Sequence, residues 1–138
     1  MTITRASGTA PRVPLLQAPL RHALRADGIC SAVAGAAIIA AAGPLSAVTG
    51  IPLPVEYGIG LGFLLYGVTL LALAQRPKIR AAGIGVAIAN ALGTLIALVV
   101  VVAAVPPLTA AGVLGVVGIG LYTAGFAVVQ YRGARRLT

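Results

Sequence analysis

The chain has 138 residues, of which 59% are hydrophobic and 9% are charged, and its formal net charge is +8. A soluble domain of this length does not need so apolar a composition, so we predict an integral membrane protein. The positive charge does not indicate a nucleic-acid-binding protein, because the basic residues flank apolar stretches and lack interleaved aromatic side chains that could stack on bases.

Residues 1–27 precede the first apolar stretch and are predicted to form a cytoplasmic tail that is partly disordered or interfacial. Pro11, Pro14 and Pro19 are expected to keep its first part from becoming one long helix. The segment 15–24 mixes leucine with basic residues, so both a short amphipathic helix in the headgroup layer and a disordered tail stay open. Arginine and proline interrupt this region, and we therefore predict no cleaved signal peptide.

Four apolar stretches follow, each close to the ~20 residues with which a helix crosses ~30 Å of hydrocarbon. Their predicted bounds are 28–48, 55–75, 81–104 and 109–131, and residues 132–138 form a basic tail. The predicted fold is all-α: a four-transmembrane-helix bundle with antiparallel, up-down-up-down order.

Residues that start or end helices lie at the predicted span boundaries. Gly43 and Pro44 are expected to kink or stop the first helix. Pro54 suits the first turn of the second helix, where a missing N–H costs nothing. Pro106 is expected to help end the third helix, and Thr109 to cap the fourth.

All ten Lys and Arg residues lie in the two predicted tails or in the connection between the second and third spans. They are Arg5, Arg12, Arg21, Arg25, Arg76, Lys78, Arg80, Arg132, Arg135 and Arg136. This positive-inside pattern predicts a cell-membrane protein with both termini in the cytoplasm. The basic side chains would also attract anionic lipid headgroups. The connection is short, so the second and third spans are predicted to be antiparallel neighbours.

Small residues recur along one face of every span, a pattern typical of close packing between helices in lipid. The predicted stripes are Gly28, Ala32, Ala36 and Ala40 with Ser31 and Gly35 beside them, then Gly58 and Gly62, then Gly85, Ala89 and Gly93, and finally Gly120 and Ala124. Internal packing of the bundle accounts for them. A homo-oligomer or a partner membrane subunit is the alternative.

Asn90 is the most central strongly polar residue in any span, with Thr94 one helical turn further along. Its candidate partners are Tyr66 and Thr69 of the second span and Tyr122 and Thr123 of the fourth. We predict an intramembrane polar site at Asn90, Thr94, Tyr66 and Tyr122. Hydrogen bonding between helices and a substrate or lipid site are both open.

Asp27 and Glu56 are the only acidic residues. Each is predicted near an interface at the start of a helix, where the helix dipole stabilises a carboxylate. Proton, cation or ligand binding is the alternative for each. They lie at opposite membrane faces, which excludes a pair of carboxylates for acid–base hydrolysis. Gln75 and Gln130 are assigned no special role.

The sequence contains no motif that indicates an enzyme, a cofactor or a metal site. Cys30 and His22 are single residues of their kinds, so they provide neither a disulfide within the chain nor a pair of haem ligands. The leading hypothesis is a non-enzymatic membrane component that binds lipids or a partner subunit. The alternative is a small transporter that acts as a homo-oligomer.

Several stretches occur together in a family of small membrane proteins. They are LRADG before the first span, GPLSAVTGIP after it, GLGFLLYGVTLLALAQRP in the second, IANALG in the third, LTAAG before the fourth and VVQYRGARR at the end. In this layout the chain resembles small four-span integral membrane proteins of actinobacteria. Those proteins often have a Trp soon after the Asn, where this chain has Ala91-Leu92-Gly93. The resemblance implies a membrane location and no particular activity.

Overall fold

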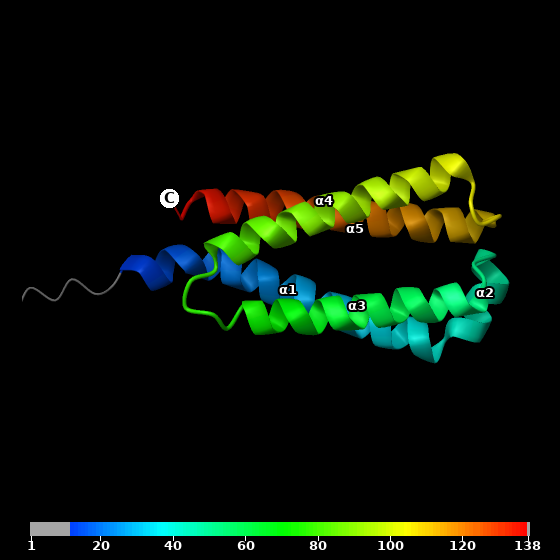
Figure 1. The fold of residues 1–138 in the computed structure, drawn as a ribbon, viewed down its shortest axis with the longest axis horizontal. Coiled ribbons are helices and arrows are strands. Elements are labelled where there is room, and N and C mark those ends of the chain that lie inside the picture. Colours follow the sequence, from blue (N-terminus) through cyan, green and yellow to red (C-terminus); the bar gives the residue numbers. More distant parts are fainter. Residues whose placement is uncertain (1–11, 138) are drawn as a thin grey trace, which may run out of the picture.

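The computed structural model describes residues 12–137. They form five helices: α1 (Arg12–Ala40), α2 (Ala42–Thr49), α3 (Leu53–Leu73), α4 (Arg80–Ala103) and α5 (Ala110–Arg135). All except α2 are long and apolar enough to cross a membrane. The four long helices alternate in direction along the bundle (Figure 1). The predicted all-α bundle is therefore confirmed.

The start of α1 differs most from the sequence prediction. The helix begins at Arg12 rather than near Gly28, and it continues through Pro19. A proline inside a helix removes one backbone hydrogen bond and normally disrupts the turn. Here Leu20 and Leu24 of the same segment are 1% and 0% exposed, so burial of their side chains offsets that loss. Segment 15–24 is thus part of a packed helix.

Several of the predicted helix boundaries are found in the structure. α1 ends at Ala40, whose carbonyl would need the N–H that Pro44 lacks. α2 ends at Thr49 and is capped by Gly50, which has a left-handed φ of 78° that glycine adopts without strain. Thr109 caps α5 as predicted, because its hydroxyl accepts a hydrogen bond of 3.1 Å from the backbone N–H of Gly112.

The long helices are arranged as two pairs, α1 with α3 and α4 with α5 (Figure 1). The sequence prediction that the second and third spans are direct neighbours is wrong, because α3 and α4 make little direct contact. The connection between them covers residues 74–79, and its Ile79 is fully buried in the core between the two pairs. This leaves space between α3 and α4 along the middle of the bundle.

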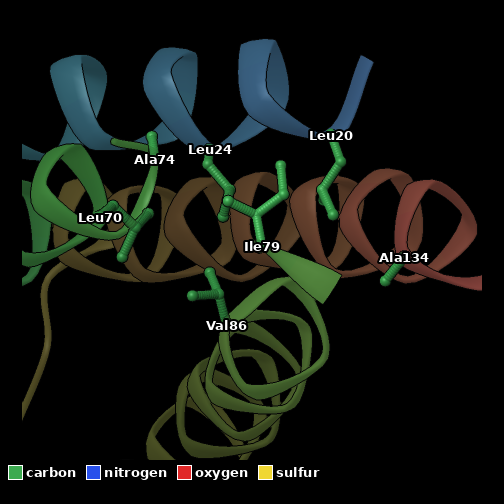
Figure 2. Packing of buried hydrophobic residues seen from close by; sticks show 7 residues of the cluster. All are labelled: Leu20, Leu24, Leu70, Ala74, Ile79, Val86 and Ala134. Atoms are coloured by element: carbon green, nitrogen blue, oxygen red, sulfur yellow. The ribbon is translucent and has the colours of Figure 1, made fainter. Parts of the chain in front are cut away.

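The two pairs meet in a hydrophobic core at one end of the bundle. The buried side chains in Figure 2 are Leu20 and Leu24 of α1, Leu70 and Ala74 at the end of α3, Ile79 and Val86 at the start of α4, and Ala134 of α5. The same end holds the α3–α4 connection and the end of α5 (Figure 1). We call it the basic end, because Arg76, Lys78, Arg80, Arg132, Arg135 and Arg136 lie there.

Hydrogen bonds also join the elements at both ends of the bundle. At the basic end, the Arg21 guanidinium of α1 donates to the carbonyls of Ala74 and Arg76, which follow the end of α3. A basic side chain suits the unpaired carbonyls of a helix C-terminus. At the opposite end, the Thr109 hydroxyl donates to the carbonyl of Val48 at 2.6 Å. The first of these contacts joins α1 to the end of α3 within one pair, and the second joins α2 to the start of α5.

Within the first pair, glycines bring the backbones of α1 and α3 into close contact. A Cβ added at Gly67 would lie 2.5 Å from the backbone nitrogen of Ala32, and one added at Gly35 would lie 2.4 Å from that of Leu64. Real Cβ atoms do not approach backbone so closely. Only glycine is compatible with this spacing of the two helices.

The glycines that make these contacts are only partly the predicted ones. Gly28 and Gly35 of α1 do face α3, whereas Ala36 is exposed. In α3, a Cβ at Gly58 or Gly62 would meet nothing within 4 Å, so that predicted pair makes no close helix contact. The spacing of glycines alone could not identify the packed face, because α3 has several glycines on different faces.

Candidate functional site

The carboxylate of Asp27 lies at the centre of a buried polar cluster. Its side chain is 0% exposed and accepts four hydrogen bonds. The donors are Ser31 Oγ at 3.2 Å, Asn90 Nδ2 at 2.8 Å, Tyr122 Oη at 2.9 Å and Gln130 Nε2 at 2.7 Å. We call these five residues the Asp27 cluster. Since they come from α1, α4 and α5, the cluster joins the two helix pairs.

Three members of the cluster form a closed ring of hydrogen bonds. Asn90 Nδ2 donates both to Asp27 Oδ2 and, at 2.9 Å, to Gln130 Oε1. Gln130 Nε2 completes the ring by donating to Asp27 Oδ2. The carboxylate only accepts, so each amide must turn its NH₂ group toward it. Both N–H groups of Asn90 are then used, and its Oδ1 lies on the other side of the amide.

None of the four donors to Asp27 carries a formal charge, so the cluster as a whole is negative when Asp27 is ionised. A charged side chain inside a membrane protein is costly and usually marks a functional site. Hydrogen bonds from neutral groups reduce that cost, although they leave the charge uncompensated. The arrangement is compatible with attraction of a positive group from outside the cluster.

Asp27 does not occupy the place at a helix start that the sequence predicted. α1 begins at Arg12, so the N-terminal dipole of that helix does not account for the carboxylate. Asp27 follows Arg21 by six residues, which places it about 9 Å further along the helix axis. Asp27 therefore lies inside the bundle, between the basic end and the middle of α1.

Glu56 lies in the first turn of α3, as the sequence predicted. It is also buried, at 4% exposure, and its Oε1 accepts a hydrogen bond of 2.8 Å from the hydroxyl of Thr49. That hydroxyl accepts in turn from the N–H of Ile51 at 3.1 Å. Glu56 thus stabilises the connection between α2 and α3, at the end of the bundle opposite the basic end, and it is not part of the Asp27 cluster.

The predicted intramembrane site is only partly brought together. Asn90 and Tyr122 both donate to Asp27. Thr94 lies one turn away and contacts the hydroxyl of Thr123 at 2.8 Å, so it joins α4 to α5 instead. The hydroxyl of Tyr66 is buried and has no hydrogen-bond partner among the described residues. Tyr66 nevertheless lines the same cavity as Asn90.

Gln130 and Ser31 are the members of the site that sequence analysis missed. The sequence prediction assigns Gln130 no special role, yet its side chain is 0% exposed and belongs to the cluster. A signal was present: Ser31 follows Asp27 by four residues and Gln130 follows Thr123 by seven, spacings that place each pair on one helix face. Two polar side chains on one face of an apolar helix indicate that this face forms hydrogen bonds with polar residues of a neighbouring helix.

A groove runs between α3 and α4 and reaches the Asp27 cluster. Its polar part is a cavity of about 450 Å³ lined by Tyr66, Asn90 and Thr123 together with apolar residues. A second cavity of about 280 Å³ continues toward the opposite end of the bundle. The two share the residues Ile59, Phe63, Gly93, Ile96 and Thr123. We call the combined space the α3–α4 groove.

The groove follows from the way in which the helices pack. The two pairs are held together by the core at the basic end and by the bonds between α2 and the start of α5 at the other. Between these ends α3 and α4 make little contact, and small residues such as Gly62 and Gly93 line the space. On the other side of the pairs, a cavity of about 410 Å³ includes Ser31 and Tyr122.

The structural features agree with a small multi-pass membrane protein, in which four apolar helices enclose the buried carboxylate of Asp27. Comparison with known proteins adds no family to this description: no protein-family model, no curated protein and no solved structure matches the chain.

Proposed function

We propose that this protein is a non-enzymatic multi-pass membrane protein that binds an amphiphilic molecule from the membrane in the α3–α4 groove. The observation that carries this proposal is the chemistry along the groove. One part is lined by Asn90 and Tyr66, next to the Asp27 cluster, and the continuing cavity is lined almost entirely by apolar side chains. An amphiphile has the same division into a polar head and an apolar chain.

The dimensions of the groove support the same proposal. Its larger cavity, of about 450 Å³, falls within the range of roughly 300–1,000 Å³ that is typical of small-molecule sites. Ile59, Phe63 and Ile96 line both cavities and would contact an alkyl chain along much of its length. The space between α3 and α4 lies at the side of the bundle, so an amphiphile could reach it from the bilayer.

The distribution of charge supports an orientation for this binding protein. We place the basic end at the cytoplasmic face of the cell membrane, with both termini in the cytoplasm, where the basic residues would contact anionic lipid headgroups. A reporter enzyme that is active only outside the cytoplasm should be inactive when fused to the C-terminus. Activity of that fusion would contradict the orientation.

Filling the groove should remove the bound amphiphile. Gly62 lines the groove, and a Cβ added to it would meet nothing within 4 Å, so Gly62→Leu is expected to extend into the cavity without displacing a helix. The protein is purified in a mild detergent and its bound lipid is measured by native mass spectrometry. We expect wild type to retain an amphiphile and Gly62→Leu to lose most of it.

Gly58→Leu is the matched control for this experiment. Gly58 lies one turn away in α3, also has nothing within 4 Å of an added Cβ, and does not line either cavity of the groove. It adds the same side chain to the same helix, so it should retain as much amphiphile as wild type. Equal loss in both variants, or no bound amphiphile in wild type, would contradict the proposal.

The burial of Asp27 favours one second candidate, a small transporter that acts as a homo-oligomer. Transporters use carboxylates embedded in the membrane, and Asp27 is 0% exposed within α1. This hypothesis predicts proton-coupled uptake into vesicles that contain the protein, and its loss in Asp27→Asn. Unchanged uptake in that variant, or none in wild type, would count against transport while leaving the groove as a binding site.

A further inference from the structure

The polar part of the α3–α4 groove presents hydrogen-bond acceptors beside the carboxyl group of Asp27. This inference rests on the proposed function, because it concerns the headgroup of the amphiphile that the groove would bind. Both N–H groups of Asn90 are directed at Asp27 and Gln130. Asn90 lines the groove, and the hydrogen bonds of its side chain to described residues all use Nδ2, which leaves the amide oxygen Oδ1 without a donor among them.

Tyr66 provides a second unused polar group at the same place. Its hydroxyl is buried, has no hydrogen-bond partner among the described residues, and belongs to a side chain that lines the groove with Asn90. A buried hydroxyl without a partner is destabilising. A ligand group that bonds to this hydroxyl and to the Asn90 oxygen would remove that cost.

The negative charge of an ionised Asp27 favours a positive ligand group over a negative one. Asn90 links the groove to the Asp27 carboxylate, whose four donors are all neutral. The residues that line the groove include no Lys or Arg. A negative headgroup would be repelled by Asp27 and would find no cation there, whereas a positive headgroup would be attracted.

We propose that the α3–α4 groove selects amphiphiles whose headgroup is a hydrogen-bond-donating cation, of the primary alkylammonium type. The ammonium donates to Asn90 Oδ1 and to the oxygen of Tyr66, and its charge is balanced by Asp27. The alkyl chain lies along Ile59, Phe63 and Ile96. Three features of the amphiphile therefore contribute separately to its affinity: the charge of the headgroup, the N–H donors of the headgroup and the alkyl chain.

Four probes with the same alkyl chain separate these contributions: dodecylammonium, dodecanol, dodecyltrimethylammonium and dodecanoate. Each competes with a fluorescent amphiphile for the full-length protein in nanodiscs made of neutral lipid. Dodecylammonium should compete at a concentration more than about tenfold below that of dodecanoate, because the charge on the headgroup is reversed. Dodecyltrimethylammonium keeps the charge and lacks N–H donors, so it should compete less well than dodecylammonium.

Two variants test whether the preference for dodecylammonium depends on Asp27 and Tyr66. Asp27→Asn should abolish the advantage of dodecylammonium over dodecanol. Tyr66→Phe should weaken dodecylammonium more than dodecyltrimethylammonium, and Tyr57→Phe is its control because Tyr57 is exposed and outside the groove. If Asp27→Asn does not fold, Tyr66→Phe decides the result.

The possible failures of this experiment are distinct. Equal competition by dodecanoate and dodecylammonium, or a preference that survives the change at Tyr66, would overturn the headgroup inference while leaving amphiphile binding intact. Competition that is the same in Gly62→Leu and in wild type would instead show that the probes bind elsewhere, and this outcome would overturn the proposed function as well.

Discussion

Asp27→Leu is expected to lower the free energy of unfolding by about 2–4 kcal/mol. Leucine has nearly the shape of aspartate, so the change removes the acceptor without leaving a large cavity. The amide of Asn90, the amide of Gln130 and the hydroxyl of Tyr122 would each lose a hydrogen bond. The first two side chains are 2% and 0% exposed, so water cannot easily replace the carboxylate. The measurement is equilibrium unfolding in mixed micelles, followed by far-ultraviolet circular dichroism.

A triple variant tests the reason for this loss. Asp27→Leu, Asn90→Leu and Gln130→Met together replace the hydrogen-bonded ring by apolar side chains of similar shape. Replacing all partners of a buried hydrogen bond is often nearly neutral, whereas removing one partner is not. The triple variant should therefore be more stable than Asp27→Leu alone. If the losses simply add, the unpaired amides are not the cause.

Gly67→Ala is expected to destabilise the first helix pair by about 1–3 kcal/mol. The added Cβ would lie 2.5 Å from the backbone nitrogen of Ala32 and 2.5 Å from the carbonyl oxygen of Gly28. These are backbone atoms, so no side-chain rotation relieves the overlap, and α1 must move away from α3. The same unfolding measurement reports the loss.

Gly58→Ala is the control for this prediction, because its Cβ would meet nothing within 4 Å. Alanine favours helix over glycine by up to about 1 kcal/mol, so this variant should be as stable as wild type or slightly more stable. Equal stability of Gly67→Ala and Gly58→Ala would mean that α1 and α3 are not in close contact at Gly67.

The four long apolar helices could be predicted because they depend on local properties of the chain. Four apolar stretches of membrane-spanning length are visible directly in the sequence, and so is Thr109 at the start of α5. Glu56 was placed correctly in the first turn of its helix, because Pro54 identifies that turn. In each case the signal and the structure lie within a few residues of each other.

The centre of the site could not be predicted because it depends on how distant segments pack. The sequence predicts Asp27 at the membrane boundary, because the charged residues before it indicate a span that begins at Gly28. The helix in fact starts at Arg12, because Leu20 and Leu24 contribute to the core. In the bundle Asp27 lies within hydrogen-bond distance of Asn90 and Gln130, which are 63 and 103 residues away from it in the sequence.

The pairing of the helices also could not be predicted from sequence patterns. A short connection predicts that α3 and α4 are neighbours, yet each packs mainly on another helix. Ile79 in the connection is buried between the pairs, and no periodic pattern identifies such a residue. The groove exists because of this separation, so its presence could be recognised only from the three-dimensional arrangement.

The central claim, that the α3–α4 groove holds an amphiphile, is tested most directly by photo-crosslinking. A long-chain alcohol with a diazirine in its chain is added to the protein in nanodiscs, irradiated, and its attachment sites are mapped by peptide mass spectrometry. We expect crosslinks at Ile59 or Phe63, and their loss in Gly62→Leu. Crosslinks confined to outward-facing side chains such as Leu61 and Leu95, with the same yield in Gly62→Leu, would contradict the claim.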